Sequence, residues 1–429
     1  MVAGVASPAS PSLRSTLVRA EGIHVWDAGG RRYLDAISGA FCVQLGYSRT
    51  DLVRVMAEAA SRLPFARPTT FDSEESEGYA RELLAAAGPP FSRVLFTSSG
   101  SEAVEAALKT AYRYQRAAGY AGRTRVAHLR GHFHGATLAA LQVTDYGPRR
   151  APYETVLAGG SPALAEEAGG RPLDEEVGDA AALIAETVPA AGLGAPVPPP
   201  GYLARLRGAC DAGRALWIAD EVLTGFGRVG PLFAWKRLAE RPEDQGAVPD
   251  IVAFGKGAGA GYAPVGGVLL AHRVASALDS APDGPFVHAQ TYGGNPIACA
   301  VGRRVLAALR EEKIDARVRE KETLLAGALA PLARHPHVRE VHGLGFLHGV
   351  ELQADRSGAP FPRGLAIAER MEAACRERGI LVYTGVGSAD GARGDFLLIA
   401  PPLVSDPHHF AQIAIAITQA LDEVMGGFP

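Results

Sequence analysis

Two short apolar runs, each followed by a charged residue, constrain the fold of this chain most strongly. Residues 216–219 and 251–254 each fit a buried strand bounded by turn residues. Asp220 follows the first run directly, and Lys256 follows the second after one glycine. In an open parallel sheet, ligands bind in the crevice outside the carboxyl ends of the strands. We therefore expect a carboxylate and an amine to lie near one another at the mouth of one crevice.

A lysine in a glycine-rich turn against a buried strand is costly unless its amine is used. A lysine that loses its charge through burial can form an imine with an aldehyde. Pyridoxal 5'-phosphate (PLP) carries such an aldehyde, and its pyridine nitrogen needs a carboxylate that keeps the ring protonated. Lys256 and Asp220 therefore supply the minimum that PLP requires, and we predict that they are the two catalytic residues.

The sequence around these two residues resembles the class III aminotransferases, which are PLP enzymes of fold type I. The most similar segments are Asp220-Glu221-Val222, Gly225-Phe226-Gly227-Arg228 and Phe254-Gly255-Lys256-Gly257. Other similar blocks follow in family order over nearly the whole chain, among them Tyr33-Leu34-Asp35-Ala36, Gln290-Thr291-Tyr292 and the run that ends in Ala400-Pro401-Pro402-Leu403.

A turn of small residues precedes a long helical pattern early in the chain. Strand 94–97 is followed by Ser98-Ser99-Gly100-Ser101 and then by a helix from residue 102 towards 116, and Ser99 with Glu102 fits a capping box. The N–H groups at the start of a helix form an anion site. Because the family has its phosphate-binding turn here, we expect Ser99, Gly100 and Ser101 to bind the PLP phosphate.

The resemblance also implies the remaining cofactor contacts. Relatives have an aromatic-His-Gly motif where this chain has Phe133-His134-Gly135, and their aromatic ring stacks on one face of the pyridine. Val222 would cover the opposite face, and Glu186 would help to order the site, although Thr187 replaces the proline that usually follows. In relatives the threonine that matches Thr291 reaches the phosphate of the neighbouring subunit, which implies a homodimer with shared active sites.

The chain departs from the family pattern where a substrate carboxylate would bind. Members with a fixed arginine often carry it three residues before the Pro-Pro pair, where this chain has Leu398. A leucine offers no bidentate contact to a carboxylate. Arg393, in a glycine-rich loop, and Arg67 are the alternatives, unless both are solvated surface arginines. Phe41 matches an aromatic pocket wall of relatives, and a plain core position explains it equally well.

A length of 429 residues allows two domains. As the resemblance implies, we expect a large α/β domain at residues 71–311, with a mainly parallel, seven-stranded type of sheet between helices, and a small α+β domain at 312–429. Residues 1–70 would join the small domain and cover the active site. Residues 74–87 and 296–310 read as helices and 268–271 as an edge strand, while 158–180 read as a surface excursion and the first residues as a frayed tail.

Other kinds of site fit the sequence less well. His128, His132 and His134 could suggest a metal, but their spacing is not a zinc pattern, so we predict no metal site. The segment from Gly225 to Gly230 matches the dinucleotide motif GxGxxG. Pro231 follows at once, however, and no helix begins there, which disfavours a dinucleotide fold.

Composition narrows the classes of partner. A net charge of −3 argues against nucleic acid or an anionic membrane as the main partner. No run of about 18 apolar residues is present that could span a bilayer. The four cysteines lie far apart without CxxC spacing, which indicates a reducing compartment, and we expect the cytoplasm.

The expected reaction is the transfer of an amino group from an amine or amino acid to a 2-oxo acid. Lys256 would hold PLP as an imine (a Schiff base) and later move the proton, while Asp220 keeps the pyridine ring protonated. The same residues serve elimination, replacement, racemisation and decarboxylation, so a non-transaminating PLP enzyme in a biosynthetic pathway is the alternative. A catalytically silent binding protein is disfavoured because both residues are present.

Overall fold

The computed structural model describes residues 15–157, 163–164, 172–281, 284, 286, 288–426 and 428. The expected frayed tail at residues 1–11 lies outside this range, as do residues 158–162 and 165–171 of the surface excursion expected at 158–180. The described part of that excursion contains a strand of the central sheet, Ala163–Leu164, and a short helix, Leu173–Val177. None of the helices in the described part of the chain is both long and apolar enough to cross a bilayer.

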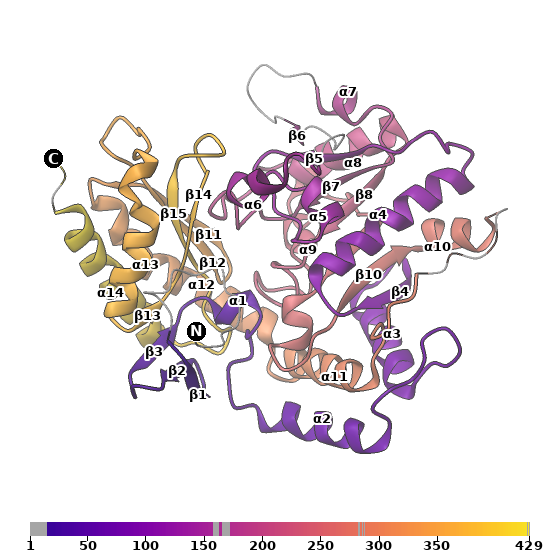
Figure 1. Ribbon diagram of the computed structural model, residues 1–429, viewed down its shortest axis with the longest axis horizontal. Coiled ribbons are helices and arrows are strands. Elements are labelled where there is room, and N and C mark those ends of the chain that lie inside the picture. Colours follow the sequence, from indigo (N-terminus) through magenta and orange to yellow (C-terminus); the bar gives the residue numbers. More distant parts are fainter. Residues whose placement is uncertain are drawn as a thin grey trace.

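A seven-stranded sheet forms the centre of the larger part of the molecule, in the order β4-β10-β9-β8-β7-β5-β6 (Figure 1). Its strands are β4 (Phe91–Thr97), β5 (Val126–Leu129), β6 (Ala163–Leu164), β7 (Ala182–Glu186), β8 (Leu216–Asp220), β9 (Ile251–Phe254) and β10 (Gly266–Ala271). β10 pairs antiparallel with both β4 and β9, and the other neighbouring strands pair in parallel, so the sheet is mainly parallel, as expected.

The prediction of an edge strand at residues 268–271 is wrong. β10 lies between β4 and β9 and is hydrogen-bonded along both sides, and all of its residues are buried. A fully apolar run is typical of a strand covered on both faces. The position of that strand within the sheet depends on pairing with β4, about 170 residues earlier in the chain, which local sequence does not encode.

Helices cover both faces of the sheet, which explains why its strands are apolar throughout. Leu216 and Ile218 of β8 pack in the same core as α4 (Gly100–Ala117), whereas Trp217 and Ala219 pack in the core of α8 (Tyr202–Gly213). Successive side chains of a strand point to opposite faces, so each face of β8 is buried by its own helix. The other helices of this part are α2 (Thr50–Arg62), α3 (Glu74–Ala87), α5 (Leu138–Gln142), α6 (Gly147–Arg150), α7 (Leu173–Val177), α9 (Ala234–Leu238), α10 (His272–Asp279) and α11 (Pro296–Glu311).

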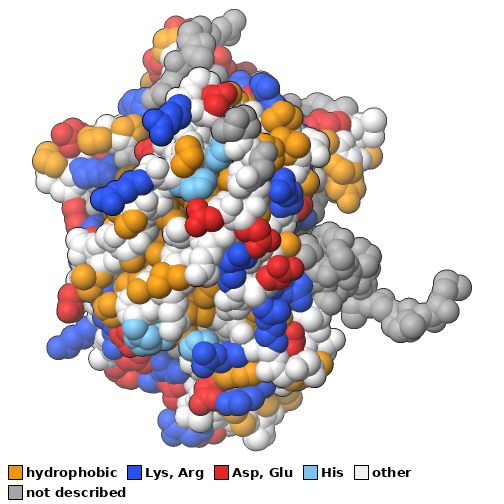
Figure 2. All heavy atoms as spheres, turned by 90° about the vertical axis from the view of Figure 1, so that its left-hand side faces the viewer, with side chains coloured by type: hydrophobic (Ala, Val, Ile, Leu, Met, Phe, Trp, Pro, Cys, Tyr) orange, Lys and Arg blue, Asp and Glu red, His pale blue; other side chains and the backbone are white. Residues whose placement is uncertain are grey.

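A second, smaller sheet lies beside the large one, on the left in Figure 1, in the order β11-β12-β15-β14. Its strands are β11 (Val338–Leu344), β12 (Leu347–Leu352), β14 (Tyr383–Val386) and β15 (Asp395–Ile399), and its helices are α12 (Ile314–Leu329), α13 (Ile367–Glu377) and α14 (Pro407–Met425). Figure 2 shows the molecule from this side, where acidic and basic side chains are interspersed rather than gathered into a field of one sign.

The N-terminal segment belongs structurally with the C-terminal part. β1 (Leu17–Glu21), β2 (His24–Asp27) and β3 (Arg32–Asp35) form a sheet whose fourth strand is β13 (Ile380–Leu381), parallel to β3. The short helix α1 (Ser38–Phe41) then leads away from this sheet. The association of residues 1–70 with the small domain and the boundaries at residues 70 and 311 remain predictions.

The glycine-rich segment after β8 joins the two parts of the molecule through Arg228. The buried side chain of Arg228 donates to the carbonyl oxygens of Phe346 (3.2 Å) and Pro401 (2.7 Å) and to Oγ of Ser38 (3.0 Å). The next helix, α9, begins only at Ala234, so the helix that a dinucleotide motif would open is absent from this described segment.

Candidate active site

A cavity of about 570 Å³ lies at the carboxyl ends of the central strands, with α1 and β14 also contributing to its wall. Ten of the residues expected at the site line it: Phe41, Ser99, Gly100, Ser101, Phe133, His134, Glu186, Asp220, Val222 and Lys256. The other three expected residues, Arg67, Thr291 and Arg393, are not among the described residues that line it.

Lys256 begins a tight turn directly after β9. Its φ of 40° lies in the left-handed region, which a non-glycine residue rarely adopts, and a Cβ on the neighbouring Gly257 would lie 2.1 Å from the Gln44 amide. Its Nζ lies 5.1 Å from the centroid of the Phe41 ring. Burial lowers the pKa of Lys256, although the charges of Asp220 and Glu186 act in the opposite direction. A lowered pKa favours the neutral amine, which is the nucleophilic form.

Asp220, at the end of β8, is buried and held by two neighbours. Its Oδ2 lies 2.7 Å from Nδ1 of His134, and its Oδ1 accepts a hydrogen bond of 3.0 Å from the backbone N–H of Val222. The carboxylate therefore has a fixed orientation in the cavity. Beside the pyridine nitrogen of a bound PLP, such a carboxylate would favour the protonated pyridine ring.

Glu186 ends β7 and pairs in register with Asp220 on the neighbouring strand. Its Oε2 accepts a hydrogen bond of 2.9 Å from the N–H of Phe133, which fixes the backbone of the aromatic residue. Burial raises the pKa of Glu186 to about 7. Thr187 stands where relatives have a proline. Its hydroxyl donates to Oε1 of Glu221 at 2.7 Å and so provides a hydrogen bond to this second buried carboxylate.

The turn at the start of α4 differs in one detail from the prediction. Oγ of Ser99 accepts a hydrogen bond of 3.2 Å from the N–H of Glu102, as expected for the cap. The Glu102 carboxylate accepts from the N–H of Ser98 at 2.7 Å, one residue earlier than a capping box requires, so the predicted box is only half formed. The first N–H groups of a helix have no partner within it and remain available to an anion.

Gly100 permits a close approach between this turn and the opposite wall. A Cβ at position 100 would lie 2.5 Å from Cγ1 of Val222, which is closer than real contacts allow. The turn can thus form one end of the cavity while Val222 remains against it. A buried amine, an oriented carboxylate and a helix N-terminus beside a glycine together match the aldehyde, ring nitrogen and phosphate of PLP.

The expected substrate arginines lie outside the cavity wall. The Arg393 side chain is 56% exposed and donates from Nε to Oδ2 of Asp390 at 2.7 Å within its own loop. Arg67 is also exposed. Leu398, at the position of the fixed arginine, is fully buried in an apolar cluster. Phe41 is buried and also part of the cavity wall, and its role towards a substrate remains a prediction.

Four lining residues carry no signal in the sequence that we could use. Tyr146, Arg149 and Tyr153 lie in or beside the short helix α6 and the turn that follows it, where the sequence has neither a periodic pattern nor a motif. Tyr383 lies at the start of β14, and only the packing of the small sheet against the large one brings it to the cavity.

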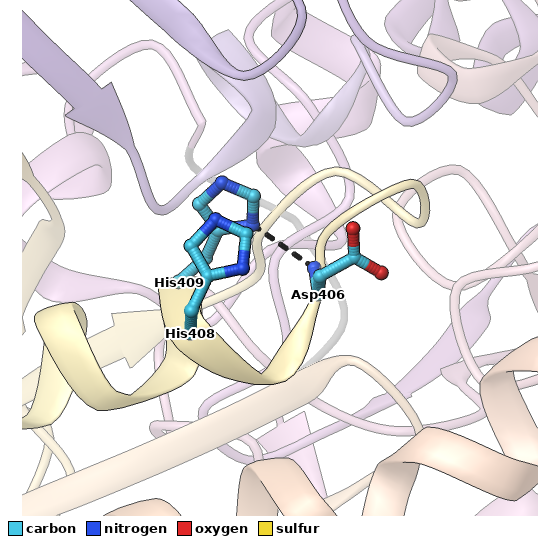
Figure 3. Close-up of side chains that lie close together, drawn as sticks. All are labelled: Asp406, His408 and His409. Atoms are coloured by element: carbon cyan, nitrogen blue, oxygen red, sulfur yellow. Dashed lines mark hydrogen bonds between the residues drawn. The ribbon is translucent and has the colours of Figure 1, made fainter.

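Two of the three histidines near β5, His132 and His134, hold carboxylate-bearing residues of the site in place. Nδ1 of His132 accepts from the N–H of Glu186 at 2.9 Å, and His134 holds Asp220. A different group, Asp406, His408 and His409, brings candidate metal ligands together at the start of α14 (Figure 3). There the N–H of Asp406 donates to Nδ1 of His409 at 3.0 Å, and Lys321 pairs with the carboxylate of Asp406, so two of these three candidate ligands already have partners.

Comparisons with known proteins agree with this geometry. The family model described as "Aminotransferase class-III" matches residues 5–421. The chain is 31% identical to an omega-aminotransferase of Caulobacter vibrioides, over 92% of this chain and 90% of that protein. It is 30% identical to a putrescine–pyruvate aminotransferase of Pseudomonas aeruginosa, over 95% and 90%.

A solved structure shows the same fold over nearly the full length. It is the PLP-bound form of an amine transaminase from an uncultivated Pseudomonas species, with a TM-score of 0.88 and 30% identity over 99% of this chain and 98% of that chain. The expected family, fold type, enzyme class and cofactor are therefore confirmed. The chain belongs to the class III aminotransferases, enzymes that use PLP to transfer an amino group from an amino donor to an oxo acid.

Proposed function

We propose that this enzyme takes the amino group from a primary amine whose amino carbon bears no carboxylate, and passes it to a 2-oxo acid. The cavity wall carries the proposal: the side chains of Ile37, Phe41, Leu141 and Leu223 present apolar surface to the space around Lys256. Apolar walls favour apolar substituents on a donor. Two of the relatives named above, an omega-aminotransferase and an amine transaminase, point the same way.

The residues of the cavity have separate tasks in this reaction. Lys256 would hold the aldehyde of PLP, Asp220 its ring nitrogen, and the turn at Ser99–Ser101 its phosphate. When bound, PLP supplies an electron-accepting ring that stabilises the negative charge left when a proton leaves the carbon next to nitrogen. The amine of Lys256, whose pKa is lowered by burial, can take up that proton and return it.

We further propose a homodimer with shared active sites. Phe65, Phe71 and Tyr292 form an aromatic face in which Phe71 is 67% and Tyr292 62% exposed, and the rings of Phe65 and Tyr292 lie 6.2 Å apart. Exposed apolar patches of this kind often mark interfaces. Thr291 is exposed beside Tyr292 and away from its own cavity wall, which suits a residue that serves a neighbouring copy.

Since all four cysteines are free, we keep the cytoplasm as the proposed compartment.

The choice of donor can be tested by following the absorption band of bound PLP. The purified enzyme, loaded with PLP, is mixed with carboxylate-free primary amines and, separately, with α-amino acids. We expect the amines to convert the cofactor to its aminated form and a 2-oxo acid to restore the original band. Lys256→Ala serves as the inactive control. Fast conversion by α-amino acids together with no conversion by amines would contradict the proposed donor.

A further inference from the structure

The short helix α6 forms the rim of the cavity where the two parts of the molecule meet. Figure 1 shows α6 on the side of the large sheet that faces β14 and β15. A Cβ on Gly147 would lie 2.8 Å from the carbonyl oxygen of Gly391, so the loop between β14 and β15 rests against the start of this helix. Arg149, two residues further on, is exposed and lines the cavity.

Arg149 is the one charged lining residue without a task in binding the cofactor or ordering its site. The charged residues among the described part of the wall are Arg149, Glu186, Asp220 and Lys256. Lys256 and Asp220 are assigned to PLP, and Glu186 is an acid that orders Phe133. Arg149 is thus the cation of this wall that remains for a substrate.

The guanidinium of Arg149 has no ion-pair partner among the described residues, unlike those of its neighbours. The adjacent Arg150 pairs with Glu154 at 2.9 Å and donates to two backbone carbonyls, which turns it away from the cavity. Arg393, in the loop that rests against α6, pairs with Asp390. A planar guanidinium without a partner is suited to bind a carboxylate with two parallel hydrogen bonds.

The side chains of Tyr383 and Phe41 line the cavity wall between Arg149 and the catalytic lysine. Arg149 and Tyr383 both line the cavity, Arg149 from α6 and Tyr383 from β14. The ring of Tyr383 lies 5.6 Å from that of Phe41, and the Phe41 ring lies 5.1 Å from Nζ of Lys256. The wall therefore passes from apolar beside the lysine to phenolic and then to cationic at the rim.

We infer that Arg149 binds the carboxylate of the 2-oxo acid acceptor, in place of the arginine that is missing at Leu398. This inference rests on the proposed function, because a donor without a carboxylate would leave Arg149 unused. The two substrates then use different parts of one cavity. The donor is recognised by the apolar wall, and the acceptor by the rim.

The test compares the two half-reactions in the PLP-loaded enzyme. Arg149→Met removes the charge and leaves an unbranched side chain. Arg149→Lys keeps a positive charge but loses the planar guanidinium that can donate two parallel hydrogen bonds. We expect Arg149→Met to raise the KM for the 2-oxo acid roughly ten- to a hundredfold, the scale of a lost charge-assisted contact, with kcat changed much less. Arg149→Lys should give an intermediate value. The half-reaction with a carboxylate-free amine should stay within about twofold of the wild type in both variants.

A binding measurement provides a readout apart from turnover. Glutarate carries carboxylates but no oxo group, so calorimetry on the PLP-loaded enzyme reports carboxylate binding alone. Its affinity should fall in Arg149→Met by a factor similar to the change in KM. Arg67→Met and Arg393→Met are the matched arginine removals outside the cavity wall, and neither should show this pattern.

Two results would overturn the inference. One is an equal effect of Arg149→Met on both half-reactions, or no effect on either. The other is the selective loss of the oxo-acid half-reaction in Arg67→Met or Arg393→Met while Arg149→Met behaves as the wild type. A wild-type enzyme that reacts with amines but with no 2-oxo acid would instead contradict the proposed function, and glutarate binding would still decide the role of Arg149.

Discussion

Asp220 depends on His134 and on the N–H of Val222 for its orientation, and its negative charge is what a bound pyridine ring requires. Asp220→Asn keeps the shape of the side chain. Its amide oxygen can accept from the N–H of Val222, and its amide nitrogen can donate to Nδ1 of His134, so the fold should survive. The neutral amide cannot stabilise a protonated ring nitrogen, and we expect turnover to fall at least about a hundredfold. Turnover and thermal unfolding are measured together. Asp279→Asn, at an exposed pair with Arg93, is the matched control and should change neither. A near-normal rate in Asp220→Asn would mean that this carboxylate does not face the ring nitrogen.

Glu186 gives the cofactor-free protein a predictable dependence of stability on pH. Burial raises its pKa from 4.5 to about 7, so the folded state binds the proton more tightly than the unfolded state. The stability from this proton is fully present below about pH 4.5 and is lost as pH rises through about 7, a change of roughly 3 kcal/mol. Glu186→Gln does not titrate. Urea unfolding of both proteins at several pH values should show the wild type losing stability relative to the variant as pH rises, and parallel curves would falsify the raised pKa.

At the start of α4, Gly100 lets the N-terminus of the helix lie close to Val222, in the turn after β8, so that both line the cavity. Gly100→Ala would bring a methyl group to within 2.5 Å of Val222, so one of the two must move. We expect weaker retention of PLP, measured by dialysis and absorbance, and a lower melting temperature. The double variant Gly100→Ala, Val222→Ala should recover part of the loss, because the clash is removed. Gly208→Ala, in a helix position with nothing within 4 Å, is the control and should stabilise the fold by up to about 1 kcal/mol. A Gly100→Ala protein that retains PLP normally would show that the turn adapts without cost.

The same elements show how far sequence alone reaches. The bounds of α3 and β9 were predictable because Gly88 with the prolines after it, and Gly255, are strong local stop signals. The position of β10 in the sheet was not, since pairing with a distant strand decides it. Lys256 and Asp220 could be found because strand ends carry a local signal. Arg149 and Tyr383 could not, because only the packing of the two parts brings them to one cavity.

At the scale of the whole molecule, the candidate active site lies where the two parts meet, and the exposed aromatic face of Phe65, Phe71 and Tyr292 carries Thr291 beside it in the sequence. If that face joins two copies, each active site takes Lys256 from one chain and Thr291 from the other. Thr291→Ala alone should then weaken retention of PLP while the protein stays dimeric. Tyr292→Glu, which places a charge on the aromatic face, should shift the protein towards the monomer in size-exclusion chromatography.

Mixed dimers give the sharpest test of this arrangement. In a hybrid of one Lys256→Ala chain and one Thr291→Ala chain, shared sites place both defects in one active site and leave the other intact. Random assembly makes about half of the dimers hybrids, and each hybrid has one intact site out of two. Activity at limiting PLP should therefore recover to roughly a quarter of the wild type, whereas Lys256→Ala alone has none. The control mixes each variant chain with itself under the same conditions. If Thr291 served the cavity of its own chain, every site in the hybrid would carry one defect, and no activity would return on mixing.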